Sequence, residues 1–240
     1  MKKILELGCG QGYHALILSQ RHRVIGVDIS KSDLLVAAKR YPWLALLAMS
    51  GPALGFKSQV FDAVYALDML EHVDNLVSTI GEIRRCLKVG GEVIANIPYW
   101  KSENWLLGVR PSCHNEIHHL RIFGENELES IMERFNFKTI EKKRRGFLSH
   151  LELLIQFKSK QKSRSQLGIG NWRDNIWTAT LHLGLLYFNP LVLKTPLRYF
   201  PVWLITLPIG MLVDFLGNKK FPKSLFYHFL LENSDGEKKG

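Results

Sequence analysis

A glycine-rich turn stands near the start of this chain, between an apolar segment and a helical pattern. Residues 4–7 are mostly apolar and lead into the turn 8–12, which carries glycine at every second position. A second short apolar segment, residues 24–27, ends on Asp28. A strand, a glycine turn, a helix and a second strand ending on an acid form the unit with which a doubly wound sheet binds a nucleoside. Glycines let the backbone approach the ligand because no Cβ intervenes, and the carboxylate suits ribose hydroxyls.

The spacing of the glycines separates two kinds of cofactor. The dinucleotide fingerprint is G-x-G-x-x-G and seats a pyrophosphate on a helix N-terminus. Here the pattern is Glu6-x-Gly8-x-Gly10-x-Gly12, with an acid two residues before the first glycine. A carboxylate in that place repels a pyrophosphate but accepts hydrogen bonds from a cationic amino group. The stretch resembles motif I of the class I S-adenosylmethionine (SAM) dependent methyltransferases, and the resemblance implies that these four residues and Asp28 bind SAM.

Three later stretches resemble the same family in the expected order. Residues 61–66 match F-D-x-V, residues 70–73 match L-E-H-V, and residues 83–93 match R-x-L-K-x-G-G. This series is typical of the methyltransferase group that includes the ubiquinone and menaquinone biosynthesis enzymes. The resemblance covers roughly residues 2–157. It implies an α/β, Rossmann-like fold with a seven-stranded doubly wound sheet and an antiparallel last strand.

Two departures from the family pattern concern the cofactor site. Family members usually carry an acid that contacts the adenine amino group shortly before a Leu-Pro-Phe-like element, whereas Ser50 or Gly51 stands there in this chain. The adenine contact therefore stays open between the backbone and Ser50. The resemblance also places Leu67 and Asp68 near the adenine and ribose. The second departure is that the chain starts on the first strand, without the helices that usually precede it and help to cover the site.

Hydrophobic periodicity and the positions of glycine and proline predict the elements. We predict strands at residues 3–7, 23–28, 44–49, 60–67 and 90–97, helices at 12–21, 31–40, 73–88 and 125–134, and a closing hairpin formed by 137–143 and 147–157. A polar basic stretch then marks a boundary, beyond which the composition shifts to long uncharged runs. The predicted division is a methyltransferase domain at 1–157, a basic linker at 158–174 and an apolar helical extension at 175–240.

The residues after the predicted fourth strand are the first candidates for acceptor chemistry. Asp68, Glu71 and His72 stand at i, i+3 and i+4, so they can share one helical face. His118 lies in the histidine-rich segment 113–123, at the edge of the sheet where loops gather over the cofactor. His72 or His118 could act directly as a general base, and this direct role is favoured. The alternative without chemistry is that Glu71 and His72 match the charge of the helix terminus.

A divalent metal is a further interpretation of these residues. Asp68, Glu71, His72 and His118 offer the oxygen and nitrogen ligands that could hold an ion and lower the pKa of an acceptor hydroxyl. The spacing resembles E-x-x-E-H of the ubiquinone-pathway O-methyltransferases and the small-RNA 2′-O-methyltransferases, with Asp68 in place of the first Glu. Many relatives share L-E-H-V without a metal, so the metal is not favoured.

The uncharged runs in the second half predict contact with a membrane surface. Residues 175–193 are apolar but interrupted by polar side chains, and residues 199–213 are too short for a span and hold two prolines. Both are therefore predicted as interfacial or re-entrant segments, with a cap on the sheet or a dimer interface as alternatives. Basic residues flank them and suit an anionic leaflet: Arg173, Lys194, Arg198, Lys219, Lys220 and Lys223.

Composition sets the last limits on function. The net charge of +10 favours an anionic partner, and three scattered cysteines indicate a reducing compartment. No Asn/Asp-Pro-Pro-Tyr/Phe motif follows the fourth strand, which argues against the usual exocyclic-amine nucleic-acid methyltransferases. We therefore predict SAM-dependent methyl transfer, with O-methylation favoured, to a small-molecule or lipid-linked acceptor. The expected place is the cytoplasm, at the inner face of the membrane. The alternatives are an RNA methyltransferase and a SAM-binding protein without catalysis.

Overall fold

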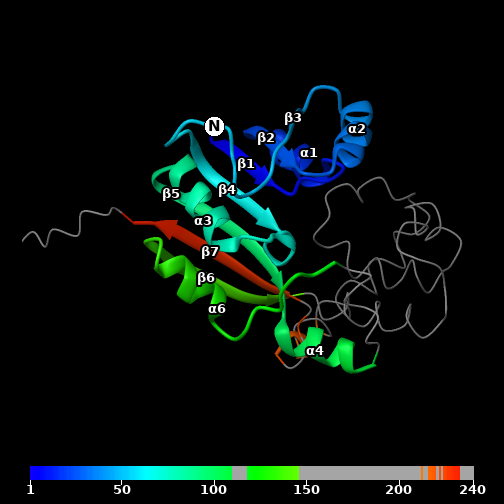
Figure 1. Cartoon of the computed structure of the whole chain (residues 1–240), viewed down its shortest axis with the longest axis vertical. Coiled ribbons are helices and arrows are strands. Elements are labelled where there is room, and N and C mark those ends of the chain that lie inside the picture. The colour runs from blue at the N-terminus through cyan, green and yellow to red at the C-terminus, as the bar shows by residue number, and fades with distance from the viewer. Residues whose placement is uncertain (110–117, 146–211, 213–215, 220–221, 223, 233–240) are drawn as a thin grey trace, which may run out of the picture. The chain divides into compact units, whose positions relative to one another are not determined.

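Seven strands form one mixed sheet in the order β3-β2-β1-β4-β5-β7-β6 (Figure 1). The structure is a computed structural model that describes residues 1–109, 118–145, 212, 216–219, 222 and 224–232. The strands are β1 (Lys3–Leu7), β2 (Arg23–Asp28), β3 (Ala45–Ala48), β4 (Phe61–Leu67), β5 (Leu87–Pro98), β6 (Phe137–Arg145) and β7 (Ser224–Leu231). The helices are α1 (Tyr13–Ser19), α2 (Lys31–Arg40), the 3₁₀ helix η1 (Leu70–His72), α3 (Leu76–Cys86), α4 (Trp100–Val109) and α6 (Glu127–Glu133).

The central strands are parallel and buried. In β1 four of the five residues are buried, as expected for a parallel strand covered on both faces. It pairs with β2 through Leu5 opposite Ile25, and with β4 through Leu5 opposite Val64. The carboxyl ends of β1, β2 and β4 therefore meet at one edge of the sheet. The chain reverses its strand order between β1 and β4, which is where doubly wound sheets bind their ligands.

Local capping explains where α2 and α3 begin. The hydroxyl of Ser30 accepts a hydrogen bond from the Asp33 amide at the start of α2. At the start of α3, the side chain of Asn75 accepts one from the Ser78 amide. Helix α3 then buries one apolar stripe at helical spacing, and Ile80 and Ile83 of this stripe belong to the core.

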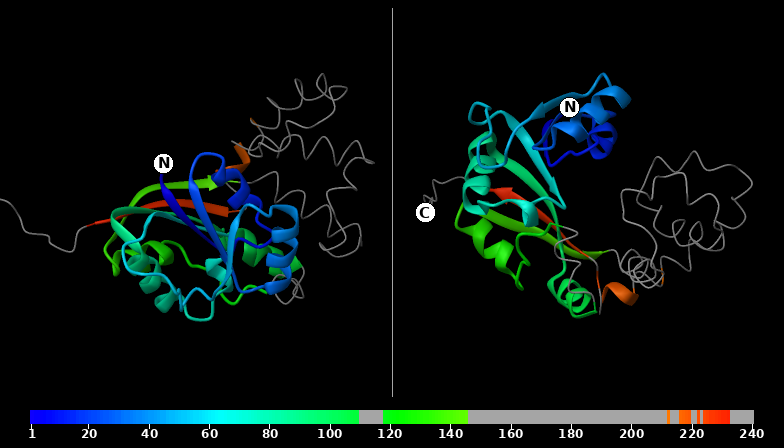
Figure 2. Two further views of the ribbon diagram at one scale, coloured as in Figure 1. Left: turned by 90° about the horizontal axis from the view of Figure 1, so that it is seen from above. Right: turned by 45° about the vertical axis from the view of Figure 1, so that its right-hand side comes forward.

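The antiparallel strand of the sheet comes from a later part of the chain than predicted. We predicted that residues 147–157 would pair with β6 in a closing hairpin. The strand beside β6 is instead β7, at Ser224–Leu231, which lies between β5 and β6 (Figure 2). Its side chains are alternately buried and half-buried, and Tyr227 and Phe229 stack with ring centroids 5.3 Å apart. Residues 147–157 lie outside the described residues.

This strand also bears on the predicted extension at 175–240. Residues 224–231 are part of the sheet, so that portion of the extension is a strand rather than a helix. The linker at 158–174 and the apolar runs lie almost entirely outside the described residues, so their division stays a prediction. By internal packing, residues 1–143 with 225–240 form one unit, and 144–224 form another. All the candidate site residues belong to the first unit.

Candidate functional site

The glycine loop, residues 8–12, leaves β1 in a left-handed backbone conformation. The φ angles of Gly8, Gly10 and Gly12 are 71°, 48° and 78°, a region that residues with a Cβ rarely occupy. The amides of Gly8 and Cys9 both donate to the carbonyl of Val27, at 2.8 and 3.0 Å. These bonds tie the start of the loop to the end of β2.

The three glycines meet different surroundings. A Cβ on Gly8 would lie 2.7 Å from Cγ of Met69, and one on Gly12 would lie 3.2 Å from Cβ of Ala37 in α2. Both glycines therefore permit close packing within the protein. A Cβ on Gly10 would meet no described atom within 4 Å. Of the three, Gly10 is thus the one whose backbone is open to an approaching ligand.

The carboxylate of Asp28 is fixed at the end of β2 by two backbone amides. Gly10 donates to Oδ2 at 2.7 Å, and Ser30 donates to Oδ1 at 2.8 Å. Because each carboxylate oxygen can accept more than one hydrogen bond, both keep capacity for a pair of ribose hydroxyls. The predicted ribose contact therefore lies directly against the open glycine of the loop.

Glu6 is a buried acid with an unsatisfied oxygen. It is 2% exposed, and its Oε2 has no hydrogen-bond partner among the described residues. Its Oε1 lies 3.7 Å from Nδ1 of His14 in the first turn of α1. Burial, and after it the negative charge of Asp28, raises the pKa of Glu6 to about 8. A buried acid beside a second acid requires a donor or a cation, and the amino group of SAM would supply both.

Leu67 and Asp68 lie where β4 ends. Leu67 is half-buried as the last residue of the strand, and Asp68 is exposed with a φ of 50°. The Asp68 amide donates to the Asn96 carbonyl at 3.0 Å, and Nδ2 of Asn96 donates to Oδ1 of Asp68 at 2.5 Å. Asn96 of β5 thus holds the Asp68 carboxylate at the carboxyl edge of the sheet.

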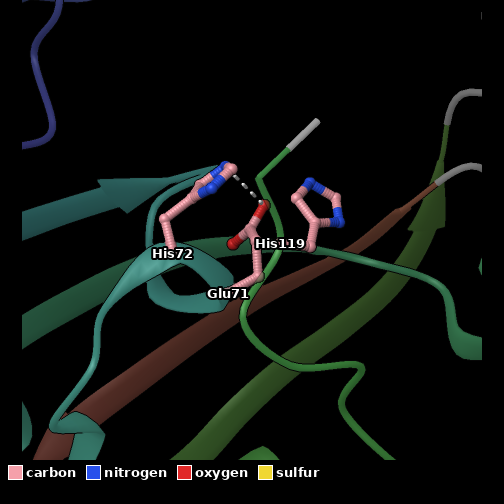
Figure 3. Close-up of side chains that lie close together, drawn as sticks. All are labelled: Glu71, His72 and His119. Atoms are coloured by element: carbon pink, nitrogen blue, oxygen red, sulfur yellow. Dashed lines mark ion pairs between the residues drawn. The ribbon is translucent and has the colours of Figure 1, made fainter. Parts of the chain in front are cut away.

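Glu71, His72 and His119 form a compact group that we call the Glu-His-His cluster (Figure 3). One ligand atom from each lies within 4.8 Å of those of the other two. Nε2 of His72 is 4.0 Å from Oε1 of Glu71, and the rings of His72 and His119 meet edge to face at 4.8 Å. A cation or a proton in transit could be held between these three side chains.

His119 rather than His118 provides the second histidine. The segment turns at His118, whose φ is 55° and whose side chain is exposed. It is the carbonyl of His118 that contacts the cluster, 2.9 Å from Nδ1 of His72. A carbonyl oxygen can only accept, so Nδ1 of His72 carries a proton, and in the neutral imidazole Nε2 then offers a lone pair. Asp68, the other predicted member, is not one of the three side chains brought together.

Glu103 is a site residue that the sequence did not single out. It lies on α4, is buried, and its Oε1 contacts Nδ1 of His119. The carboxylate therefore fixes the orientation of the His119 ring and leaves Nε2 available.

Burial, and to a smaller extent the charges of Asp68 and Glu103, raises the pKa of Glu71 to about 8. Its Oε2 has no partner among the described residues.

The segment that carries His119 is fastened to the turn after β4. The Leu120 amide donates to the carbonyl of Glu71 at 2.9 Å. The guanidinium of Arg121 donates to the carbonyls of Val73 and Asp74. These bonds place the Glu-His-His cluster at the same sheet edge as the glycine loop, next to the end of β4. The rest of the histidine-rich segment, residues 113–117, lies outside the described residues.

Known proteins are similar to the part of the chain that carries this candidate site. Residues 5–95 match the family model of the methyltransferase domain. The ubiquinone biosynthesis O-methyltransferase of Idiomarina loihiensis is 31% identical over 125 residues, which cover 47% of this chain and 49% of that protein. The demethylmenaquinone methyltransferase of Streptomyces avermitilis is 34% identical over 94 residues, 39% of this chain and 41% of that protein. The tRNA U34 carboxymethyltransferase of Pseudomonas aeruginosa is 32% identical over 102 residues, which cover 39% of this chain and 31% of that protein.

Solved structures show the same fold. A SAM-dependent methyltransferase from Thermotoga maritima has a TM-score of 0.50 and 26% identity, covering 60% of this chain and 66% of that one. The YcgJ protein of Bacillus subtilis has a TM-score of 0.57 and 15% identity, covering 97% of this chain and 92% of that one. The chain spans about half the length, or less, of the curated relatives that it matches. By this match, the sheet and these relatives, residues 5–95 belong to a methyltransferase domain of the class I SAM-dependent type.

Proposed function

We propose that this protein transfers the methyl group of SAM to the hydroxyl of a small-molecule or lipid-linked acceptor. The observation that carries the proposal is the buried, unpartnered Oε2 of Glu6 beside the open backbone of Gly10 and the fixed carboxylate of Asp28. These groups together match an amine, a close ligand approach and a ribose diol. SAM, when bound, supplies a methyl group that is activated by a sulfonium; a nucleophile attacks the methyl carbon in line and displaces the sulfur. The protein's main contribution is to position the two reactants.

The Glu-His-His cluster supports a hydroxyl as the acceptor. A hydroxyl must lose its proton to become a good nucleophile, and His72 offers a free Nε2 for that proton. His119, with Nδ1 held by Glu103, offers a second one. One relative is by its name a ubiquinone biosynthesis O-methyltransferase, which supports a hydroxyl acceptor, and another is a demethylmenaquinone methyltransferase, which supports an acceptor of the quinone type. The acceptor class is therefore an aromatic or lipid-linked hydroxyl compound.

The same cluster could instead hold a divalent metal, as a second form of the proposal. Glu71, His72 and His119 would provide one oxygen and two nitrogen ligands, with Glu103 behind His119 as an outer-shell carboxylate. The unpartnered Oε2 of Glu71 fits this as well. An ion there would lower the pKa of the acceptor hydroxyl, so the histidines would act as ligands rather than as bases.

Separate substitutions of the histidines test both forms. Changing His72 or His119 to Ala should lower turnover by roughly 10²-fold or more, with the Kd for SAM little changed. His118→Ala should have a much smaller effect, because only its backbone carbonyl contacts the cluster. Treatment with a chelator, followed by addition of Mg²⁺ or Zn²⁺, separates the forms. Full activity after chelation rules out the metal form and leaves the form in which the histidines act as bases. Turnover equal to that of the wild type in all three variants contradicts both forms.

An RNA acceptor is the alternative from another class. It is supported by the net charge of +10 and by the likeness to a tRNA U34 carboxymethyltransferase. Incubating the purified protein with radiolabelled SAM and either an extracted lipid pool or total RNA decides between the two. Label in the lipid fraction alone supports the proposal, and label in RNA alone supports the alternative. Cofactor binding without label in lipid, in RNA or in a panel of soluble phenols indicates a non-catalytic SAM-binding protein.

Contact with an anionic membrane surface completes the proposal. It is supported by the uncharged runs at 175–193 and 199–213 and by the basic residues around them. Both runs fall, apart from Leu212, outside the described residues. Among the residues that the structure describes, no helix has the length and apolar character needed to cross a bilayer. A lipid-linked acceptor at the inner face of the cytoplasmic membrane would lie within reach of a protein held there.

A further inference from the structure

Glu82 and Arg85, near the end of α3, clamp the connection between β3 and β4. Two nitrogens of the Arg85 guanidinium donate to the Glu82 carboxylate, at 2.7 and 2.9 Å. The guanidinium also donates to the carbonyls of Leu54 and Phe56, at 2.9 and 2.7 Å. The Leu54 amide in turn donates to Oε2 of Glu82 at 2.9 Å. Arg85 belongs to the R-x-L-K-x-G-G stretch, to which the proposed chemistry gives no role.

The clamped connection begins with a tight turn, residues 50–53. The Ala53 amide donates to the carbonyl of Ser50 at 3.0 Å, which closes the turn. The turn follows β3 directly, and the Met49 amide donates to the carbonyl of Asp28 at 3.0 Å. It is therefore anchored at its start to the residue proposed to bind the ribose, and at its end to α3 through Leu54.

Met69 joins this turn to the glycine loop. A Cβ on Gly8 would lie 2.7 Å from Cγ of Met69, and a Cβ on Gly51 would lie 3.3 Å from Cε of the same side chain. The same Cβ on Gly51 would also lie 2.9 Å from Cγ2 of Thr79 in α3. The turn thus has no room to move at Gly51 without displacing the buried Thr79 or the half-buried Met69.

We infer that Glu82 and Arg85 are positioning residues for the adenine end of the cofactor, and this rests on the proposed SAM site. The base is attached to the ribose that Asp28 is proposed to hold, and β3 is the next strand outward from β2. The turn carries no carboxylate, so only its backbone and the Ser50 hydroxyl can form hydrogen bonds with the base. A side chain can adjust its rotamer to a ligand, whereas the position of a backbone group is fixed by the conformation of its turn. The ion pair supplies that placement from outside the site.

Arg85→Lys is the central test, with Arg84→Lys as the matched control on the same helix. Lysine keeps the charge but cannot bridge Glu82 and two carbonyls at once. We expect the Kd for SAM, measured by calorimetry well below the melting temperature, to rise at least about fivefold in Arg85→Lys. The Kd for S-adenosylhomocysteine should rise by the same factor, because the two share the adenosine end. The KM for SAM should therefore be raised, while kcat, the turnover at saturating SAM, stays unchanged.

Glu82→Gln provides an independent second variant. The amide keeps an oxygen for Leu54 but loses the charge that orients Arg85, so a smaller rise in Kd is expected. In both variants the amides of residues 50–58 should exchange hydrogen faster than in the control, without a change in the strands. A lowered melting temperature with wild-type Kd values in both variants would show a purely structural clamp and overturn the inference. A wild-type protein that binds no SAM would instead refute the proposed site itself.

Discussion

Glu6 combines burial, a raised pKa and an oxygen without a partner. In the free protein its pKa of about 8 means that the acid is mostly neutral near pH 7. Because the folded-state pKa lies above the ordinary value of 4.5, the neutral form stabilises the fold. The contribution of Glu6 to the free energy of unfolding is therefore complete below about pH 4.5 and is lost as the pH rises through about 8. Binding a cationic amine reverses this preference, since it favours the ionised acid.

Glu6 should therefore release a proton when SAM binds. Calorimetry at pH 6.5 in two buffers of different ionisation enthalpy should show a release approaching one proton per SAM. In Glu6→Gln the release should disappear, and the affinity should fall by about tenfold or more because a charge-assisted hydrogen bond is lost. Affinity in the wild type should increase with pH up to about 8. An unchanged proton count in the variant would contradict the role given to Glu6.

Substitutions of Gly8 and Gly10 should separate stability from binding. In Gly8→Ala the new Cβ would overlap Met69, so the free energy of unfolding should fall by about 1–3 kcal/mol. In Gly10→Val there is space for the side chain in the free protein, although φ is positive there as well. The valine instead occupies the side from which the ligand approaches, so SAM binding should be abolished. Urea unfolding and calorimetry on both variants provide the two measurements.

Residues inside one short motif could be predicted from the sequence, whereas a residue placed by the turn of a loop could not. Glu6, the glycines and Asp28 follow from local spacing, because a strand and its tight turn fix their positions. His118 and His119 are neighbours in an irregular segment, and the positive φ at His118 decides which side chain faces Glu71. No periodic pattern reveals that angle. Glu103 was missed because its helix, α4, was not predicted.

At the level of elements, β7 is the part of the fold that the sequence misplaced. The boundaries of β1 to β4 follow from apolar runs that end at a glycine, a serine or an acid, and the structure confirms them within a residue or two. Residues 147–157 were chosen for the last strand because they follow β6 closely and have a suitable composition. The strand at 224–231 has the same alternation, but nothing local connects it to β6. Pairing between distant segments is a property of the packed sheet.

Removing a buried ring from β7 tests this assignment. Phe229 is fully buried in the core, so Phe229→Ala should lower the free energy of unfolding by about 3–5 kcal/mol. Ile140 lies on the neighbouring strand β6 but is 50% exposed, so Ile140→Ala is the control and should cost much less. Urea denaturation followed by circular dichroism gives both values. If the two variants were equally stable, β7 would not be an inner strand of the sheet.

On the scale of the whole molecule, the position of β7 also determines how membrane contact can be tested. Ending the chain before the uncharged runs would remove β7 as well, and a loss of binding could then result from an unfolded sheet. An internal deletion of residues 175–213, closed with a Gly/Ser linker, keeps both β6 and β7. This variant isolates the uncharged runs while leaving the described sheet intact.

Flotation with liposomes then gives a direct result. The full chain should float with vesicles that contain anionic lipid, and less of it should float as salt is added, because salt screens the basic residues. The internal deletion should stay at the bottom of the gradient, as should the full chain with neutral vesicles. A full chain that does not float under any of these conditions would refute the membrane contact.

The place of β7 in the sheet has a further consequence for how the protein is made. Between the end of β6 at Arg145 and the start of β7 at Ser224 lie 78 residues (146–223). All of them leave the ribosome before β7 does. Until β7 takes its place between β5 and β6, each of these two strands exposes the edge that β7 later pairs with. Pairing β7 with β6 across so long a sequence separation is slow compared with pairing the parallel strands at the start of the chain. The nascent protein therefore possesses its glycine loop and Asp28 well before its sheet is complete, and it is most prone to aggregate during that interval.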